Sequence, residues 1–373
     1  MVTNRGIEPA TGDGPWLRLP DDLAAFADAA PPLAVDTEFM RERTYWPNLA
    51  LVQIARDGRC GLLDPLHHPG LPGLGPLLAD PAATVLMHSA SEDLVALQPL
   101  LPGPMIGLYD TQIACAFAGL GLGLGYQAAV ERLLGVHLEK QETRSDWLAR
   151  PLTARQVQYA LDDVRHLAPM HAELEARLAG RGYRDWLLED CRQQATAAFA
   201  AEPDPQPQRA LRGAWRWSPA AQAQLRRVLL WREDHARERN LPRRWVLDDD
   251  TALAAAIEPD HGAARLVSRL AGVPPGRRRS LQALVELVAR PPDSDEIAAT
   301  EPIPGPLEGE QKALARRLRD EVEAIASQLD LPTGLLCPRR AIDAMATRGR
   351  WPADLAGWRE AVLRERLEAL LPD

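Results

Sequence analysis

The chain has 373 residues, 46% hydrophobic and 25% charged, which is enough for two or three globular domains. The longest apolar stretch, Ile113–Tyr126, is short and contains four glycines, which excludes it as a membrane span. The net charge of −9 argues against a nucleic-acid partner only on average, because Arg209–Arg290 holds 16 arginines against 9 acidic residues.

This basic segment has two explanations. Its arginines can recognise phosphates, or they can reflect a genomic base composition that also favours alanine and proline. The polar segment Met1–Asp13 has no apolar core, so we expect no signal peptide. The cysteines lie far apart without metal-binding spacing, so we expect free thiols in a reducing cytoplasm. They are Cys60, Cys115, Cys191 and Cys337.

The first third of the chain predicts a mixed sheet. An antiparallel meander is expected from Leu33–Phe39, Leu49–Ala55 and Cys60–Leu63. Two further strands, Thr84–His88 and Met105–Tyr109, are each followed by a helix. The helix after the first of these starts within Ser89–Leu94 with Ser or Asp as its cap, and Asp110 starts the other. This order predicts an α/β domain.

The Gly-rich run Gly119–Gly125 completes neither G-x-x-x-x-G-K-[ST] nor G-x-G-x-x-G, so it predicts a connection between helices rather than a phosphate loop. A helical stretch is expected over 153–179. Thr153 is its expected N-cap, with Gln156 at the capping-box position. Pro169 should kink or break this stretch.

The polar, Pro-rich segment Ala200–Gln208 predicts a linker. Most of the chain beyond it has helical periodicity. A second break containing prolines is expected over Pro291–Pro306, and Glu310–Leu371 is again helical. Two all-helical units are therefore expected after the α/β domain.

Asp36 and Glu38 follow an apolar run at a spacing that places both carboxylates on one face of a strand. Two like charges on a buried strand cost energy unless something neutralises them, and a divalent cation is the simplest candidate. The alternative is an exposed strand end with two solvated acids.

Three other residues point to the same site. Asp93 follows a buried strand at the start of a helix, where ligands of α/β sheets gather. Its alternative role is helix capping. Tyr159 and Asp163 share one helix face, which can hold a ligand or be solvated, whereas Asp162 points away from it.

The chain resembles ribonuclease D, a family of DEDD 3′→5′ exonucleases, in three motifs. They are Asp36–Pro47 with Leu49–Gln53, His88–Leu94, and Ser145–Leu152 followed by Tyr159–Val164. The resemblance implies a ribonuclease H-like α/β exonuclease domain followed by two all-α domains of the HRDC type. Its expected boundaries are 1–198 for the exonuclease domain, 199–208 for the linker, and 209–291 and 303–373 for the HRDC domains.

The resemblance implies that Asp36, Glu38, Asp93 and Asp163 are the catalytic acids and metal ligands. Tyr159 implies the Tyr subclass, since the position of the alternative His holds Gln158. His166 does not match the family's His and is expected at the rim. We expect His88 to pack at the strand end.

Two Mg²⁺ or Mn²⁺ ions, about 4 Å apart, supply the chemistry that phosphodiester hydrolysis needs. We expect Asp36 to bridge both ions, with Glu38 and Asp163 on the ion that carries the nucleophilic water, and Asp93 acting directly or through water. Tyr159, with an ordinary pKa near about 10, is expected to orient the nucleophile rather than act as a base.

Phe39 and Met40 are expected to contact the last base, although a core role for Phe39 is an equal alternative. Lys140 and Arg144 are expected to contact phosphates. Gly123 stands where family members often carry Ser, which puts fine substrate contacts in doubt.

The expected function is therefore that of a 3′→5′ exoribonuclease, which releases nucleoside 5′-monophosphates. Its expected substrates are tRNA precursors and other structured RNA, bound partly by the basic segment. We expect a cytoplasmic monomer with no membrane partner. The alternatives are a DNA 3′→5′ exonuclease with the same site and a catalytically idle RNA-binding protein.

Overall fold

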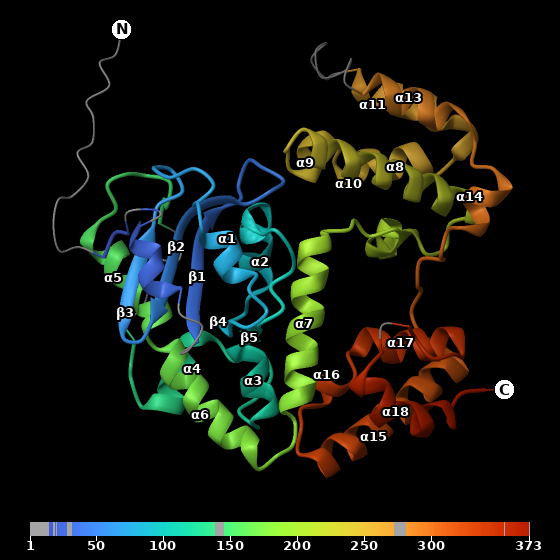
Figure 1. The fold of residues 1–373 in the computed structure, drawn as a ribbon. Helices are drawn as coiled ribbons and strands as arrows, with labels where there is room; N and C mark the ends of the chain where they lie inside the picture. Colours follow the sequence, from blue (N-terminus) through green and yellow to red (C-terminus); the bar gives the residue numbers. More distant parts are fainter. Residues whose placement is uncertain are drawn as a thin grey trace, which may run out of the picture.

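A computed structural model describes residues 15–17, 19, 21–27, 32–138, 145–271, 281–353 and 355–372. Figure 1 shows an N-terminal α/β region followed by two groups of helices that lie apart from each other. In the described ranges, no helix is both long and apolar enough to cross a membrane.

The α/β region is built on one five-stranded mixed sheet, in the order β3-β2-β1-β4-β5. β1 pairs antiparallel with β2 and parallel with β4, which confirms the predicted meander and the mixed sheet. The strands are β1 (Leu33–Met40), β2 (Asn48–Arg56), β3 (Arg59–Leu63), β4 (Val85–Met87) and β5 (Leu108–Asp110).

Helices cover this sheet, and α5 packs against β1, β2 and β3. They are α1 (Leu74–Leu78), α2 (Ser91–Leu97), α3 (Thr111–Phe117), α4 (Tyr126–Leu134), α5 (Ala154–Arg165), α6 (Leu167–Ala179) and α7 (Arg184–Ala200). The glycine-rich run joins α3 to α4, as predicted.

One detail of the predicted helices was wrong. The N-cap of α2 is Ala90, which has no capping side chain, so neither Ser nor Asp of this segment caps it. Instead, the Asp110 carboxylate accepts from the backbone N–H groups of Ser89 and Ala90, both at 2.9 Å. The stretch over 153–179 breaks at His166, which confirms the break predicted at Pro169. Pro169 sits in the first turn of α6, where its missing N–H leaves no helical bond unmade.

The first helical module comprises α8 (Pro219–Glu238), α9 (Arg243–Val246), α10 (Asp249–Ala256), α11 (Gly262–Leu270), α13 (Gln282–Ala289) and α14 (Ser294–Ala298). Helix α14 lies inside the segment that the sequence predicted to be a break. The capping box of Asp293 with Glu296 starts it.

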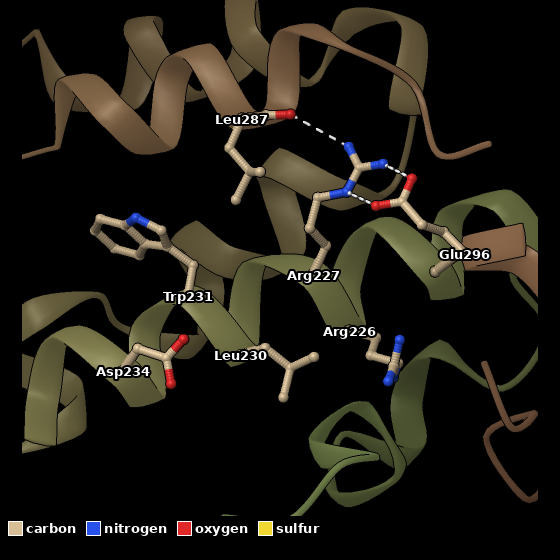
Figure 2. Close-up of a pocket in the computed structure, with 8 residues that line it drawn as sticks. Arg226, Arg227, Leu230, Trp231, Asp234, Leu287 and Glu296 are labelled. Carbon is tan, nitrogen blue, oxygen red and sulfur yellow. Dashed lines mark hydrogen bonds and ion pairs between the residues drawn. The ribbon is translucent and has the colours of Figure 1, made fainter. Parts of the chain in front are cut away.

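Arg227 links α8 to the last two helices of this module, α13 and α14. Its guanidinium donates to the Leu287 carbonyl of α13 at 3.2 Å and binds the Glu296 carboxylate of α14 (Figure 2). These groups border a surface hollow of about 290 Å³, and none of the predicted catalytic residues lines it. Because Arg227 is committed to these internal bonds, we assign it to the stability of the module.

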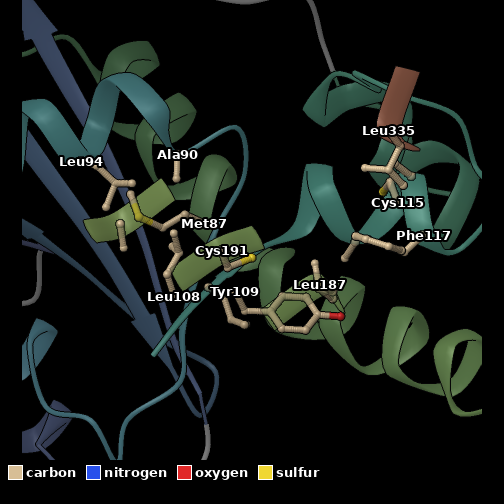
Figure 3. Packing of buried hydrophobic residues seen from close by; sticks show 14 of the residues in the cluster. Met87, Ala90, Leu94, Leu108, Tyr109, Cys115, Phe117, Leu187, Cys191 and Leu335 are labelled. Atoms are coloured by element: carbon tan, nitrogen blue, oxygen red, sulfur yellow. The ribbon is translucent and has the colours of Figure 1, made fainter. Parts of the chain in front are cut away.

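The tail module comprises α15 (Gly309–Leu329), α16 (Thr333–Leu336), α17 (Arg339–Arg348) and α18 (Trp358–Glu368). Its apolar side chains form one continuous buried cluster with those of the α/β region, whereas the first helical module has a separate core. Figure 3 shows Leu335 of α16 beside Cys115 and Phe117 of α3. The Trp358 ring stacks on the Trp186 ring of α7, with centroids 4.7 Å apart.

The tail module is also held by polar contacts that bury two charges. Arg359 binds both oxygens of Asp190 on α7, at 2.5 and 2.8 Å, and the Asp190 side chain is 9% exposed. Gly357 has φ +66°, and a Cβ there would lie 1.6 Å from a Glu189 carboxylate oxygen. The close approach of the backbone at residue 357 to Glu189 therefore requires glycine.

We expect Asp190→Ala to lower the free energy of unfolding by about 3–5 kcal/mol, because it leaves the Arg359 guanidinium unpaired in a buried site. Urea unfolding measures this loss. The control is Asp343→Ala, which removes a longer, more exposed pair with Arg339 at 3.7 Å and should cost less than about 1 kcal/mol. Equal losses in both variants would contradict the expectation.

Candidate active site

Asp36 and Glu38 lie in the middle and second half of β1, the central strand of the sheet. The strand places both on one face, and helix α5 packs against that strand. Carboxylate oxygens of Asp36, Glu38 and Asp163 lie within 4.8 Å of one another. In the described part of the chain, these three residues form the one group with such a metal-binding arrangement.

Thr37 points to the opposite face of β1 and reaches the fourth acid. Its hydroxyl donates to Asp93 Oδ1 at 2.5 Å, and Asp93 lies in the first turn of α2 with its side chain buried. Sequence reasoning missed Thr37, although the strand alternation between Asp36 and Glu38 already placed it on the other face. The structure therefore brings the oxygens of three predicted acids together, and the hydroxyl of Thr37, the residue between two of them, holds Asp93.

Burial first, and then the charges of neighbouring acids, raise the pKa of all four carboxylates. Burial raises the pKa of Asp36 well above its usual range, and the charges of Asp93, Asp163 and Glu38 raise it further. Burial, followed by the charges of Asp163 and Asp93, raises the pKa of Glu38 to about 9. Burial raises the pKa of Asp163 to about 7 and that of Asp93 to about 6. Ionising this cluster is costly because the negative charges lie close together, and a bound cation would offset that cost.

Helix α5 aims Tyr159 and Asp163 at the strand. Its start is fixed by the predicted capping box, in which Gln156 N–H donates to Thr153 Oγ1 at 3.2 Å and Thr153 N–H donates to Gln156 Oε1 at 3.0 Å. The Tyr159 hydroxyl donates to the Asp163 carboxylate one turn later. Asp162 points elsewhere, where Gln158 and Arg165 bind it, as predicted.

Burial, followed by the charges of Asp163, Glu38 and Asp36, raises the pKa of Tyr159 above its ordinary value. The phenol therefore stays protonated and acts as a hydrogen-bond donor. Its ring lies against the buried Trp147 indole, with centroids 5.7 Å apart.

Arg150 anchors the segment that precedes α5. Its guanidinium donates to both oxygens of Asp64, at 2.7 and 3.0 Å, and to the Ala50 carbonyl of β2 at 2.6 Å. It also donates to the Trp147 carbonyl at 2.8 Å. Arg150 thus ties the segment before α5, which belongs to the third motif, to the sheet. The sequence position of Arg150 did not reveal this structural role.

The two histidines lie outside the acid cluster. His88 Nε2 donates to the Leu124 carbonyl at 3.0 Å, and its Nδ1 lies 2.9 Å from Thr111 Oγ1, so its ring is packed at the strand end as expected. His166 lies at the junction of α5 and α6.

Phe39 and Met40 are half-buried at the end of β1 and belong to none of the buried clusters, so a core role for Phe39 is wrong. The pairing register with β2 shifts between Glu38 and Phe39, and such irregularities re-aim side chains beside active sites. Lys140 and Arg144 lie outside the described residues.

Comparisons with known proteins show the family to which the chain is similar. A family model described as 3′-5′ exonuclease matches residues 18–179. The chain is 39% identical to ribonuclease D of Xanthomonas oryzae pv. oryzae, over 95% of this chain and 98% of that protein. It is 31% identical to ribonuclease D of Escherichia coli, over 95% of this chain and 97% of that protein.

The fold is similar to the crystal structure of Escherichia coli RNase D, an exoribonuclease involved in structured RNA processing. The TM-score is 0.76 at 28% identity, and the match covers 95% of this chain and 97% of that chain. Strand order, acid cluster and full-length similarity thus lead to one conclusion: the chain belongs to the ribonuclease D family.

Proposed function

We propose that the chain hydrolyses RNA from the 3′ end with the help of two divalent cations and releases nucleoside 5′-monophosphates. As a member of the ribonuclease D family, the chain is a 3′→5′ exoribonuclease. The observation that carries the metal-dependent mechanism is the meeting of Asp36, Glu38 and Asp163 oxygens within 4.8 Å.

The donor set fits Mg²⁺ or Mn²⁺, because every candidate ligand is a hard carboxylate oxygen and like charges are crowded together. When bound, such ions activate water, neutralise the phosphate and stabilise the leaving oxygen. We assign Asp36 to both ions and Glu38 with Asp163 to one of them. Asp93, oriented by the Thr37 hydroxyl, acts directly or through water.

Tyr159 contributes a hydrogen-bond donor, its hydroxyl, in a fixed orientation. Its hydroxyl is held at Asp163, and its raised pKa keeps the proton in place at neutral pH. We assign it to orient the attacking water, because a protonated phenol donates but does not act as a base. We assign Phe39 and Met40, which are half-buried and follow Glu38 in the chain, to contact the 3′-terminal base.

Tyr159→Phe is expected to lower kcat by about 100-fold while leaving KM within about twofold, because the donor acts on the attacking water and not on substrate binding. Single-turnover kinetics on labelled RNA separates the two constants. A rise in KM at constant kcat would show instead that the hydroxyl binds substrate.

For the natural substrate we propose structured RNA with a 3′ tail, such as tRNA precursors. The similarity to an exoribonuclease involved in structured RNA processing supports this assignment. We also propose that residues 1–198 form the exonuclease domain, that 209–291 and 303–373 are HRDC-type domains, and that the basic first module holds RNA. We expect the protein to act as a cytoplasmic monomer.

End-labelled RNA and DNA of one sequence test the proposal. Both are incubated with Mg²⁺, Mn²⁺ or EDTA, using wild type, Asp36→Ala and Asp163→Ala. We expect stepwise shortening of the RNA from its 3′ end, and no digestion in EDTA or by either variant. Equal digestion of DNA would overturn the RNA preference, and activity that survives in EDTA would overturn the metal mechanism.

A further inference from the structure

The loop at residues 41–47, which joins β1 to β2 directly after Glu38, Phe39 and Met40, is held by the first helical module. Asn240, just beyond α8, accepts hydrogen bonds from two successive backbone N–H groups of this loop. Its Oδ1 lies 3.0 Å from Tyr45 N and 2.9 Å from Trp46 N. Figure 1 shows α9 beside this loop.

A buried polar network fixes the Tyr45 side chain in the same contact. Its hydroxyl donates to the Glu233 carboxylate of α8 and accepts from the Arg243 guanidinium of α9 at 3.0 Å. Arg243 in turn binds both oxygens of Glu233. Tyr45 is 6% and Glu233 8% exposed, so the bond between these two side chains is shielded from water, whereas the Arg243 side chain is 46% exposed and closes the network at the surface.

Apolar and cation–π contacts surround this network. Tyr45 packs with Ala236 and Val246 in one buried cluster. The Arg237 guanidinium lies over the Trp46 ring, 4.9 Å from its centroid. The loop therefore meets the module through a packed interface rather than a single bond.

Arg41, at the start of the loop, pairs with a residue next to one of the predicted acids. Arg41 Nε donates to the Tyr45 carbonyl at 2.9 Å, and the same guanidinium pairs with Glu92 at 3.1 Å. Glu92 is the neighbour of Asp93 in the first turn of α2. The held loop therefore follows Glu38 closely in the chain and pairs, through Arg41, with the sequence neighbour of Asp93.

We propose that the first helical module is a positioning element of the active site, which acts through Asn240, Glu233 and Arg243 on the loop at residues 41–47. The module thereby sets the place of Glu38 and of Phe39 against the 3′-terminal nucleotide. This role rests on the proposed function and differs from RNA tethering, because it applies even to an RNA too short to reach the module. Tyr45 is then a positioning residue.

Two RNAs with the same 3′ end test this role, one a trinucleotide and the other a long RNA. We expect Tyr45→Phe and Glu233→Gln each to lower kcat on the trinucleotide about tenfold with KM nearly unchanged, because small misplacements at a reacting centre are costly. The double variant should be no worse than either single variant, since the residues act as one unit. Asn240→Ala should show the same loss, and Asn240→Asp, which keeps the acceptor oxygen, should restore wild-type kcat.

The matched control is Tyr183→Phe, which removes a hydroxyl bond of 2.8 Å to the Leu329 carbonyl in the tail module and should leave kcat unchanged. Thermal unfolding of every variant confirms that it is folded under assay conditions. Wild-type kcat on the trinucleotide with a higher KM on the long RNA alone would show a tether and overturn the proposal. Multiplying losses in the double variant would also overturn it. A wild-type protein inactive on both RNAs would instead refute the proposed function.

Discussion

Asp36→Asn should abolish RNA hydrolysis and at the same time raise the melting temperature of the protein in EDTA. The activity loss is expected to reach at least about 10³-fold, because the catalytic acids act as one unit and the loss of one removes most of the rate enhancement of all. The gain in stability follows from burial and charge: the ionised Asp36 carboxylate is buried and is crowded by Asp93, Asp163 and Glu38, so a neutral amide of the same shape removes a desolvation penalty and relieves repulsion.

Asp162→Asn is the matched control, because Asp162 is the sequence neighbour of Asp163 but binds Gln158 and Arg165 away from the cluster. It should leave kcat nearly unchanged. Kinetics on labelled RNA and thermal unfolding in EDTA measure the two effects. An Asp36→Asn protein that is inactive and less stable than wild type would indicate that the carboxylate holds the fold together rather than a cation.

The stability of the metal-free protein should fall as the pH rises from about 5 to about 9. The pKa values of the acids are raised in the folded state, to about 6 for Asp93, about 7 for Asp163 and about 9 for Glu38. The folded protein therefore binds protons more tightly than the unfolded chain, and this stabilisation is complete below the unfolded pKa values near about 4. It is lost as the pH passes through the folded values.

Mg²⁺ or Mn²⁺ should reverse this trend, because cations bind the ionised carboxylates and their affinity rises with pH. The measurement is the difference in melting temperature between Mg²⁺ and EDTA at each pH. We expect this difference to grow towards high pH in wild type and to shrink strongly in Asp36→Asn. A difference that does not depend on pH would contradict binding at the acid cluster. EDTA should also abolish activity, and added Mg²⁺ should restore it.

Local spacing was sufficient to predict most of the acid cluster. Asp36 and Glu38 share a face because strand side chains alternate, and Tyr159 and Asp163 share a face because helical residues four apart are neighbours. Neither pattern says which strand face meets which helix face. The resemblance of the three motifs supplied that pairing, and the packing of α5 on β1 agrees with it.

Contacts between residues far apart in the chain could not be predicted in this way. The N–H groups at the start of α2 are bonded by Asp110, about twenty residues downstream, and not by the local Ser or Asp. The bond from Tyr45 to Glu233 joins residues 188 positions apart. Capping rules and periodicity describe only neighbours along one element, so such partners emerge only from the packing of whole elements.

The stack of Trp186 on Trp358 has a consequence for the order of events during synthesis. The apolar surface around Phe117 and α7 belongs to the catalytic region, yet α18 supplies part of its cover, and the Trp358 ring also meets Phe117 edge-on at 5.6 Å. A ribosome makes that cover hundreds of residues after the acids of β1. The nascent nuclease thus carries an open apolar face until residue 358 emerges, and its maturation is tied to translation of the tail.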